Sequence, residues 1–209
     1  SSGGIGSTFK AARVTERRPA RGNKPTNPRR PAFDATATER PIGPATAVFG
    51  IAGWSGSGKT TLLKGLIPTL IGRGLSVSSM KHAHHAFDID VPGKDSYEHR
   101  AAGAREVMIS SANRWALMHE LKGDKEPGLD ELISRMSPVD LLLVEGFKWE
   151  AHPKLEVHRP SVGKPLLQPG DRHIVAVASD TKLEGLGVPQ LDLSDVAAIA
   201  DGLVEERVL

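Results

Sequence analysis

The chain has 209 residues, enough for one domain of ordinary size with some residues to spare. It contains 27 lysines and arginines against 25 aspartates and glutamates, a formal net charge of +2, and no cysteine. The lack of cysteine excludes disulfide scaffolds, thiol chemistry and cysteine-ligated metal sites. Apolar runs reach only about six residues and no secretory signal is visible, so we expect a soluble, cytoplasmic protein with no membrane partner.

The positive charge belongs to the first 44 residues. They hold nine basic and three acidic residues (+6), whereas residues 45–209 hold 18 basic and 22 acidic residues (−4). With six prolines and few large apolar side chains, residues 1–44 are predicted to be a disordered tail or linker, followed by one domain over residues 45–209. The basic run at residues 17–30 could contact nucleic acid or an acidic membrane, be solvated, or lead from an upstream domain. No aromatic residue lies within this run, which argues against nucleic acid as the partner.

Hydrophobic periodicity predicts alternating strands and helices after Pro44. A buried strand over residues 47–52 precedes an amphipathic helix from Lys59 to Gly72. Further strands are predicted over residues 75–80, 106–110, 114–119, 139–144, 155–158 and 174–178. A second helix is predicted from an Asp95 cap to Arg105, and Glu98 would complete its capping box. A third helix is predicted over residues 129–136, and a fourth from a Ser194 cap to about Arg207. This order predicts a three-layer α/β fold with a mainly parallel central sheet and an additional β-hairpin.

A phosphate-binding loop joins the first predicted strand to the first predicted helix. Residues 53–60 read GWSGSGKT and match G-x-x-x-x-G-K-[ST], which makes the predicted fold P-loop NTPase-like. The glycines let backbone N–H groups wrap a phosphate, and the helix N-terminus adds partial positive charge. Lys59 would reach the β- and γ-phosphates, Thr60 would ligate Mg²⁺, and Thr61 could contact the α-phosphate. The candidate nucleotide-binding residues are therefore Gly53, Ser55, Gly56, Ser57, Gly58, Lys59, Thr60 and Thr61.

A carboxylate should complete the metal site. Glu145 ends the apolar strand 139–144 and is the best candidate to hold Mg²⁺ with Thr60, or to orient a metal-bound or attacking water. Lys59 and Glu145 are therefore the candidate catalytic pair. The motif N-K-x-D, which reads guanine in many GTPases, is absent from residues 45–209. Asp180, which follows the strand 174–178, could accept hydrogen bonds from guanine or could be a loop or cap aspartate. These motifs alone do not separate GTP from ATP.

Two other segments allow more than one interpretation. The loop after the second strand contains His82, His84, His85, Asp88 and Asp90, which could bind a transition metal, contact nucleotide, substrate or partner, or be solvated. Lys94, later in this loop, is free to meet an anion. Apolar residues at 115–118 suggest a strand buried on both sides, or alternatively an exposed hairpin edge that pairs with a second chain.

Six segments, taken in order, resemble one family. They are GWSGSGKTTLL (53–63), KHAHH (81–85), PGKDSYE (92–98), RWALM (114–118), VEGFK (144–148) and RHIVAVASD (172–180). The series closely resembles the MobB family, adaptor proteins of molybdopterin-guanine dinucleotide biosynthesis. The resemblance covers residues 47–205, and the tail is a departure because members commonly begin just before the first strand.

The resemblance implies a homodimer that binds GTP with Mg²⁺ and hydrolyses it weakly at most. It implies a partnership with the MobA-type guanylyltransferase that joins GMP to molybdopterin, and raises the option of contact with molybdopterin or a protein that carries it. The family's nucleotide-site residues correspond to Gly56, Ser57, Gly58, Lys59, Thr60 and Thr61, and its VEGFK glutamate to Glu145. We therefore expect an accessory protein rather than a dedicated enzyme.

Two rival functions remain open at this point. A small-molecule P-loop kinase would usually carry an arginine-bearing lid, and the sequence shows only the scattered Arg100, Arg105 and Arg114. A nucleic-acid binder would act through the basic tail, and its binding would then depend steeply on salt.

Overall fold

A computed structural model describes residues 46–83 and 87–205. The predicted tail, His84, His85 and the predicted helix end at Arg207 lie outside these ranges. None of the helices within them combines the length and apolar character needed to cross a bilayer.

Strands and helices are interspersed along the chain, but within residues 106–119 and 141–192 the strands follow one another without an intervening α-helix. The strands are β1 (Ala47–Ala52), β2 (Val77–Lys81), β3 (Glu106–Ser110), β4 (Trp115–His119), β5 (Leu141–Glu145), β6 (Lys154–His158), β7 (Ile174–Ser179) and β8 (Gln190–Asp192). The α-helices are α1 (Lys59–Gly72), α2 (Asp95–Ala101), α3 (Leu129–Ser134) and α4 (Val196–Glu205). Two short 3₁₀ turns, Pro160–Val162 and Gln168–Gly170, and strand β8 were not predicted from the sequence.

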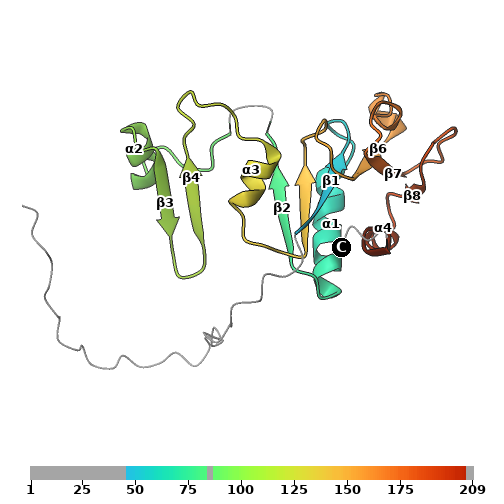
Figure 1. Ribbon diagram of the computed structural model, residues 1–209, viewed down its shortest axis with the longest axis horizontal. Coiled ribbons are helices and arrows are strands. Elements are labelled where there is room, and N and C mark those ends of the chain that lie inside the picture. The colour runs from blue at the N-terminus through green and yellow to red at the C-terminus, as the bar shows by residue number, and fades with distance from the viewer. Residues whose placement is uncertain (1–45, 84–86, 206–209) are drawn as a thin grey trace, which may run out of the picture. The chain divides into compact units, whose positions relative to one another are not determined.

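Six strands form one sheet in the order β2-β5-β1-β6-β7-β8, and every neighbouring pair is parallel. The central strand β1 pairs Ile51 with Glu145 of β5 on one side and with Leu155 of β6 on the other. Strands β3 and β4 form a separate antiparallel hairpin (Figure 1). The predicted α/β fold with a parallel sheet and an additional hairpin is confirmed.

Alternate residues of the central strands enter two different cores. Leu141 and Leu143 pack with α1 and α4 in the larger core, where Leu66 and Leu70 are completely buried. Leu142 and Val144 point to the opposite face, where they pack against α3. The continuous apolar run in β5 thus reflects a strand covered by helices on both faces.

Two strands begin later than predicted, and the side chains of Ser76 and Asp140 bind the backbone N–H groups at their entrances. The Asp140 carboxylate accepts hydrogen bonds from the backbone N–H and the hydroxyl of Ser76, at 2.7 and 2.5 Å. The Ser76 hydroxyl in turn accepts the Asp140 N–H at 2.9 Å. These contacts occupy the residues just before β5 and β2, and the strands start at Leu141 and Val77.

Both predicted caps are wrong. Lys94 is the N-cap residue of α2, so Asp95 lies inside the helix. The N-cap residue makes no side-chain hydrogen bond to the first turn of the helix. This helix ends at Ala101 rather than Arg105, because Gly103 takes a positive φ and its N–H returns to the Arg100 carbonyl. At α4, Asp195 accepts the Ala198 N–H, whereas Ser194 donates to Asp192.

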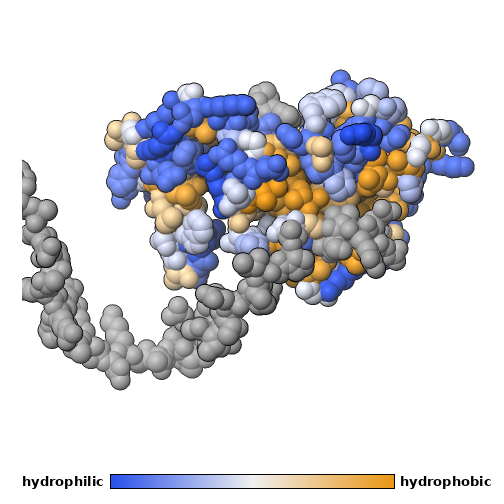
Figure 2. Space-filling model, viewed as in Figure 1, coloured by the Kyte–Doolittle hydropathy of each residue, from blue (hydrophilic) through white to orange (hydrophobic). Residues whose placement is uncertain are grey.

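Of the two interpretations of residues 115–118, the strand buried on both sides is wrong. Trp115 is 65% exposed and Leu117 45% exposed, and Met108, which pairs with Leu117 across the hairpin, is 61% exposed. In the space-filling view, orange areas over the hairpin lie beside pale and blue ones, and the largest orange areas lie over α3 and the six-stranded sheet (Figure 2). The alternating pattern correctly indicates a strand, but only part of the other face, including buried Val107, is covered.

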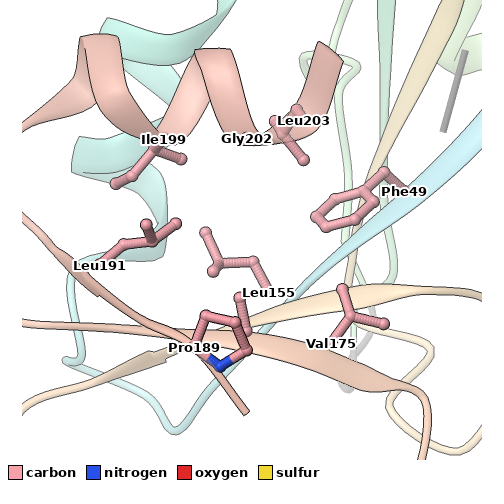
Figure 3. Close-up of a pocket in the computed structure, with 9 residues that line it drawn as sticks. Phe49, Leu155, Val175, Pro189, Leu191, Ile199, Gly202 and Leu203 are labelled. Carbon is pink, nitrogen blue, oxygen red and sulfur yellow. The ribbon is translucent and has the colours of Figure 1, made fainter. Parts of the chain in front are cut away.

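An apolar cavity of about 420 Å³ lies between α4 and the strands β6, β7 and β8 (Figure 3). Gly202 gives α4 no side chain at this position, which leaves part of the space unfilled. The cavity is lined by Phe49, Leu155, Val175, Ala176, Pro189, Leu191, Ile199, Gly202 and Leu203. None of these side chains carries a charged or hydrogen-bonding group, so the cavity offers only apolar side-chain contacts.

The other face of β6 is polar although it is buried. Lys154 and Glu156 are completely buried and alternate with the apolar Leu155 and Val157. The Lys154 ammonium donates to the Glu150 carbonyl at 2.6 Å and to the Asp171 carboxylate at 3.0 Å. The Glu156 carboxylate accepts the N–H groups of Leu167 and Gln168, both at 2.8 Å. These bonds fix the loop 160–173 onto the sheet.

His152, beside this polar strip, should make stability fall in mild acid. It is 8% exposed, and neither ring nitrogen has a hydrogen-bond partner among the described residues. Burial, and then the charge on Lys154, lowers its pKa from 6.5 to about 4 despite Asp171, which acts in the opposite direction. The unfolded chain therefore gains a proton below pH 6.5 that the folded protein does not take up until about pH 4. The free energy of unfolding should fall by up to about 3 kcal/mol across that interval.

Urea unfolding at pH 7.5, 6 and 4.5 measures this dependence. His152→Phe, which keeps a ring but removes the titrating group, should flatten the profile between these pH values. Equal pH dependence in the variant and the wild type would contradict the assignment to His152.

Candidate functional site

The phosphate loop lies where β1 leaves the sheet and α1 begins, at the edge where all six parallel strands end. Gly53 has a φ of 141°, and a Cβ there would lie 2.4 Å from the Val157 carbonyl oxygen. Gly56 and Gly58 also take positive φ values, of 82° and 100°. The loop path that the motif predicts therefore depends on glycine at Gly53 for both space and conformation.

Lys59 lies across this loop. Its ammonium donates to the carbonyl oxygens of Gly53 at 3.0 Å and Trp54 at 2.9 Å. Burial lowers the pKa of Lys59, the Glu145 carboxylate acts to raise it, and Lys148 and Lys81 lower it further. Two of its three N–H donors hold the loop, so one remains for a ligand phosphate.

The loop also contains polar groups without partners. The Ser57 hydroxyl is buried and has no hydrogen-bond partner among the described residues. The N-cap residue of α1 is Gly58, which provides no side-chain bond, so the first-turn N–H groups of Lys59, Thr60 and Thr61 remain available. Thr60 and Thr61 are exposed at this end of the helix. An anionic ligand with several oxygen acceptors fits these donors.

Glu145 ends β5 directly beside β1. It is half-buried, pairs with Ile51 in the sheet, and lies 3.8 Å from the Lys81 ammonium. The next residue, Gly146, has a φ of 100°, and a Cβ there would lie 2.7 Å from the His82 Cβ. This tight turn places Glu145 near Lys59 at the sheet edge, where a Mg²⁺ ion beside Thr60 would need an oxygen ligand.

Asp180 is connected to the phosphate loop by Arg159, a residue that was not identified from the sequence. Arg159, which follows β6, donates from Nε to the Ser57 carbonyl at 3.1 Å and from Nη1 to the Asp180 carboxylate at 2.8 Å. Asp180 is thereby linked to the phosphate loop, but its carboxylate is already paired with a cation. The signal that could have found Arg159 is its place immediately after a buried parallel strand.

The histidine-containing loop is partly outside the described residues. His82 contacts Glu126 through Nε2 at 2.8 Å and lies against Phe147, with ring centres 4.6 Å apart. The Arg100 guanidinium binds Asp88 and lowers the pKa of that carboxyl. Within residues 46–83 and 87–205, no three histidine or acidic side chains form a metal-binding group. Lys94 is exposed at the start of α2.

Comparison with known proteins agrees with the motif order. The family model "Molybdopterin guanine dinucleotide synthesis protein B" (MobB) matches residues 48–180. The "molybdopterin-guanine dinucleotide biosynthesis adapter protein" of Escherichia coli K12 is 50% identical over 161 residues, 76% of this chain and 91% of that protein. Its counterpart of the same description in Haemophilus influenzae is 44% identical and covers 74% and 85%.

Solved structures agree as well. A crystal structure described as molybdopterin-guanine biosynthesis protein B has a TM-score of 0.60 at 27% identity, covering 76% of this chain and 99% of that one. The structure of a MobB homologue from Bacillus stearothermophilus has a TM-score of 0.56 at 25% identity, covering 77% and 97%. The family resemblance inferred from the motifs is thus confirmed, and the chain belongs to the molybdopterin guanine dinucleotide synthesis protein B family.

Proposed function

We propose that this protein is a GTP-binding adaptor of molybdenum cofactor biosynthesis. It assists the MobA-type guanylyltransferase that converts molybdopterin to molybdopterin guanine dinucleotide. The observation that carries the proposal is a complete phosphate loop in a chain of this family. Among the described residues, its first-turn N–H donors are free and the Ser57 hydroxyl has no hydrogen-bond partner. Molybdopterin itself, or a protein that carries it, is the remaining candidate ligand.

In this proposal the loop holds the GTP phosphates, and Mg²⁺ is bound by Thr60 and Glu145. The metal would shield phosphate charge, while Lys59 and the first-turn N–H groups would donate to phosphate oxygens. Hydrolysis is weak at most, because Arg159, which could otherwise stabilise developing charge, is engaged by Asp180 and the Ser57 carbonyl. Glu145 remains to orient a water.

We assign guanine selectivity to Asp180. Arg159 donates to Oδ2 of this carboxylate, which still has further lone pairs that can accept from guanine, and exchanging its hydrogen-bond pattern tests the assignment. A carboxylate accepts from guanine N1–H and N2–H, whereas an asparagine amide can donate to the C2 carbonyl of xanthine. Calorimetric titration in Mg²⁺ should give tighter binding of GTP than of ATP. Asp180→Asn should lose affinity for GTP and gain affinity for xanthosine triphosphate. Equal affinity of the wild type for GTP and ATP would remove the assignment.

We extend the proposal to a homodimer formed through the hairpin. Met108, Trp115 and Leu117 expose a contiguous apolar face on an antiparallel sheet, the kind of surface that a second chain covers. Light scattering after size exclusion should give twice the chain mass of 22.3 kDa. Trp115→Glu should shift the protein toward the monomer, and Asn113→Glu in the hairpin turn should not. A monomeric wild type at micromolar concentration would exclude this dimer.

A further inference from the structure

Trp54, in the phosphate loop, is held against the loop that follows β6. Its indole Nε1–H donates to the Pro165 carbonyl oxygen at 2.7 Å, across 111 residues of sequence. The Lys148 ammonium, from the turn after β5, lies 4.8 Å from the centre of the indole ring, and the Lys164 ammonium lies 5.9 Å from it. Three separate segments therefore bring one aromatic ring and two cations together beside the phosphate loop.

Among the residues that the structure describes, Lys148 and Lys164 form no ion pair, whereas two neighbouring cations are paired, Lys81 with Glu145 and Arg159 with Asp180. The indole ring stabilises an ammonium group only modestly, and the two ammonium groups repel each other. An anion between them would turn this repulsion into attraction.

Lys148 also lies within electrostatic reach of the nucleotide site. Burial lowers the pKa of Lys59, and the charge on Lys148 adds to that effect. In the proposed function, the phosphates held in the loop are already bound by Lys59, the first-turn N–H groups and a metal ion. Lys148 and Lys164 are therefore available to bind a further phosphate group outside the loop.

We propose that Trp54, Lys148 and Lys164 form a second anion subsite that binds a phosphate group next to the phosphate loop. The inference rests on the proposed function only for the identity of the ligand that carries this phosphate. A dinucleotide contains two phosphates, and GMP supplies one, so molybdopterin must supply the other as a phosphate monoester. The γ-phosphate of GTP is the second source with the same chemistry.

The test uses inorganic phosphate as the probe and Trp54 fluorescence as the readout. In a Trp115→Phe/Trp149→Phe background, Trp54 is the remaining tryptophan. Saturating GDP and Mg²⁺ fill the phosphate loop and leave out the γ-phosphate, and phosphate is then titrated. We expect a saturable fluorescence change whose midpoint weakens about tenfold or more in Lys148→Ala/Lys164→Ala. The charge-matched control, Lys64→Ala/Lys182→Ala, should titrate like the parent protein.

Repeating the titration with a non-hydrolysable GTP analogue separates the two sources. Exclusion of phosphate by the analogue would identify the subsite with the γ-phosphate, and continued binding would identify it with a separate phosphorylated ligand. The proposal is overturned if the parent protein shows no saturable response with GDP bound, or if Lys148→Ala/Lys164→Ala responds equally. Calorimetry of GDP alone tests the proposed function separately, so a lysine-dependent phosphate response without GDP binding would retain the subsite and reject that function.

Discussion

Lys59→Met is expected to weaken binding of GTP with Mg²⁺ by about 10- to 150-fold. A hydrogen bond to a charged group contributes about 1.5–3 kcal/mol, which corresponds to that range of dissociation constants. Methionine keeps an unbranched side chain in the helix but removes the ammonium that donates to Gly53 and Trp54 and would donate to phosphate. Isothermal titration calorimetry measures the change.

The matched control for this variant is Lys64→Met. Lys64 is exposed on the same helix, and its loss removes the same charge. GTP affinity within about threefold of the wild type is expected for the control, because an exposed charge at that distance is screened by salt. Wild-type affinity in Lys59→Met, with its thermal unfolding unchanged, would show that the loop does not bind the nucleotide as assigned.

The largest loss of stability is expected from Lys154→Met. The completely buried ammonium is bonded to Asp171, whose side chain is 10% exposed, and to the Glu150 carbonyl. Burial acts to raise the pKa of Asp171, yet hydrogen bonds from His173 and Lys154 lower it overall, so the carboxylate is held ionised. Removing one partner of a buried ion pair costs about 3–5 kcal/mol. For a domain of this size, Tm should fall by roughly 6–20 °C.

Two further variants separate the ion pair from general packing. Lys154→Met/Asp171→Asn should recover part of the lost stability, because the second change removes the uncompensated carboxylate. Lys182→Met removes an exposed lysine 3.5 Å from Glu184 and should change the free energy of unfolding by no more than about 1 kcal/mol. If Lys154→Met and Lys182→Met have the same small effect, the buried pair does not anchor the loop 160–173.

The central elements of this fold could be predicted because their signals are local. The apolar strand at 47–52, the glycine-rich turn and the 3.6-residue periodicity after Lys59 together specify β1, the phosphate loop and α1. Glu145 followed from the same reasoning, since it ends a strongly apolar strand. These residues need no knowledge of strand order beyond the rule that parallel strands end at one edge.

Contacts between distant segments could not be predicted in this way. Arg159 meets Ser57 across 102 residues, and Trp54 meets Pro165 across 111, only because β6 lies beside β1 in the sheet. The hairpin shows a different limit. Its alternating apolar residues predict a strand, but the pattern does not show which chain, if any, covers Trp115 and Leu117.

Formation of the dinucleotide is the most direct measurement of the central claim. A MobA-type guanylyltransferase is incubated with molybdopterin, GTP and Mg²⁺, with and without this protein, and molybdopterin guanine dinucleotide is quantified. Wild-type protein should increase the yield or rate and form a complex with the enzyme, whereas Lys59→Met should give less stimulation. Absence of both stimulation and complex formation with the folded wild-type protein would contradict the adaptor function.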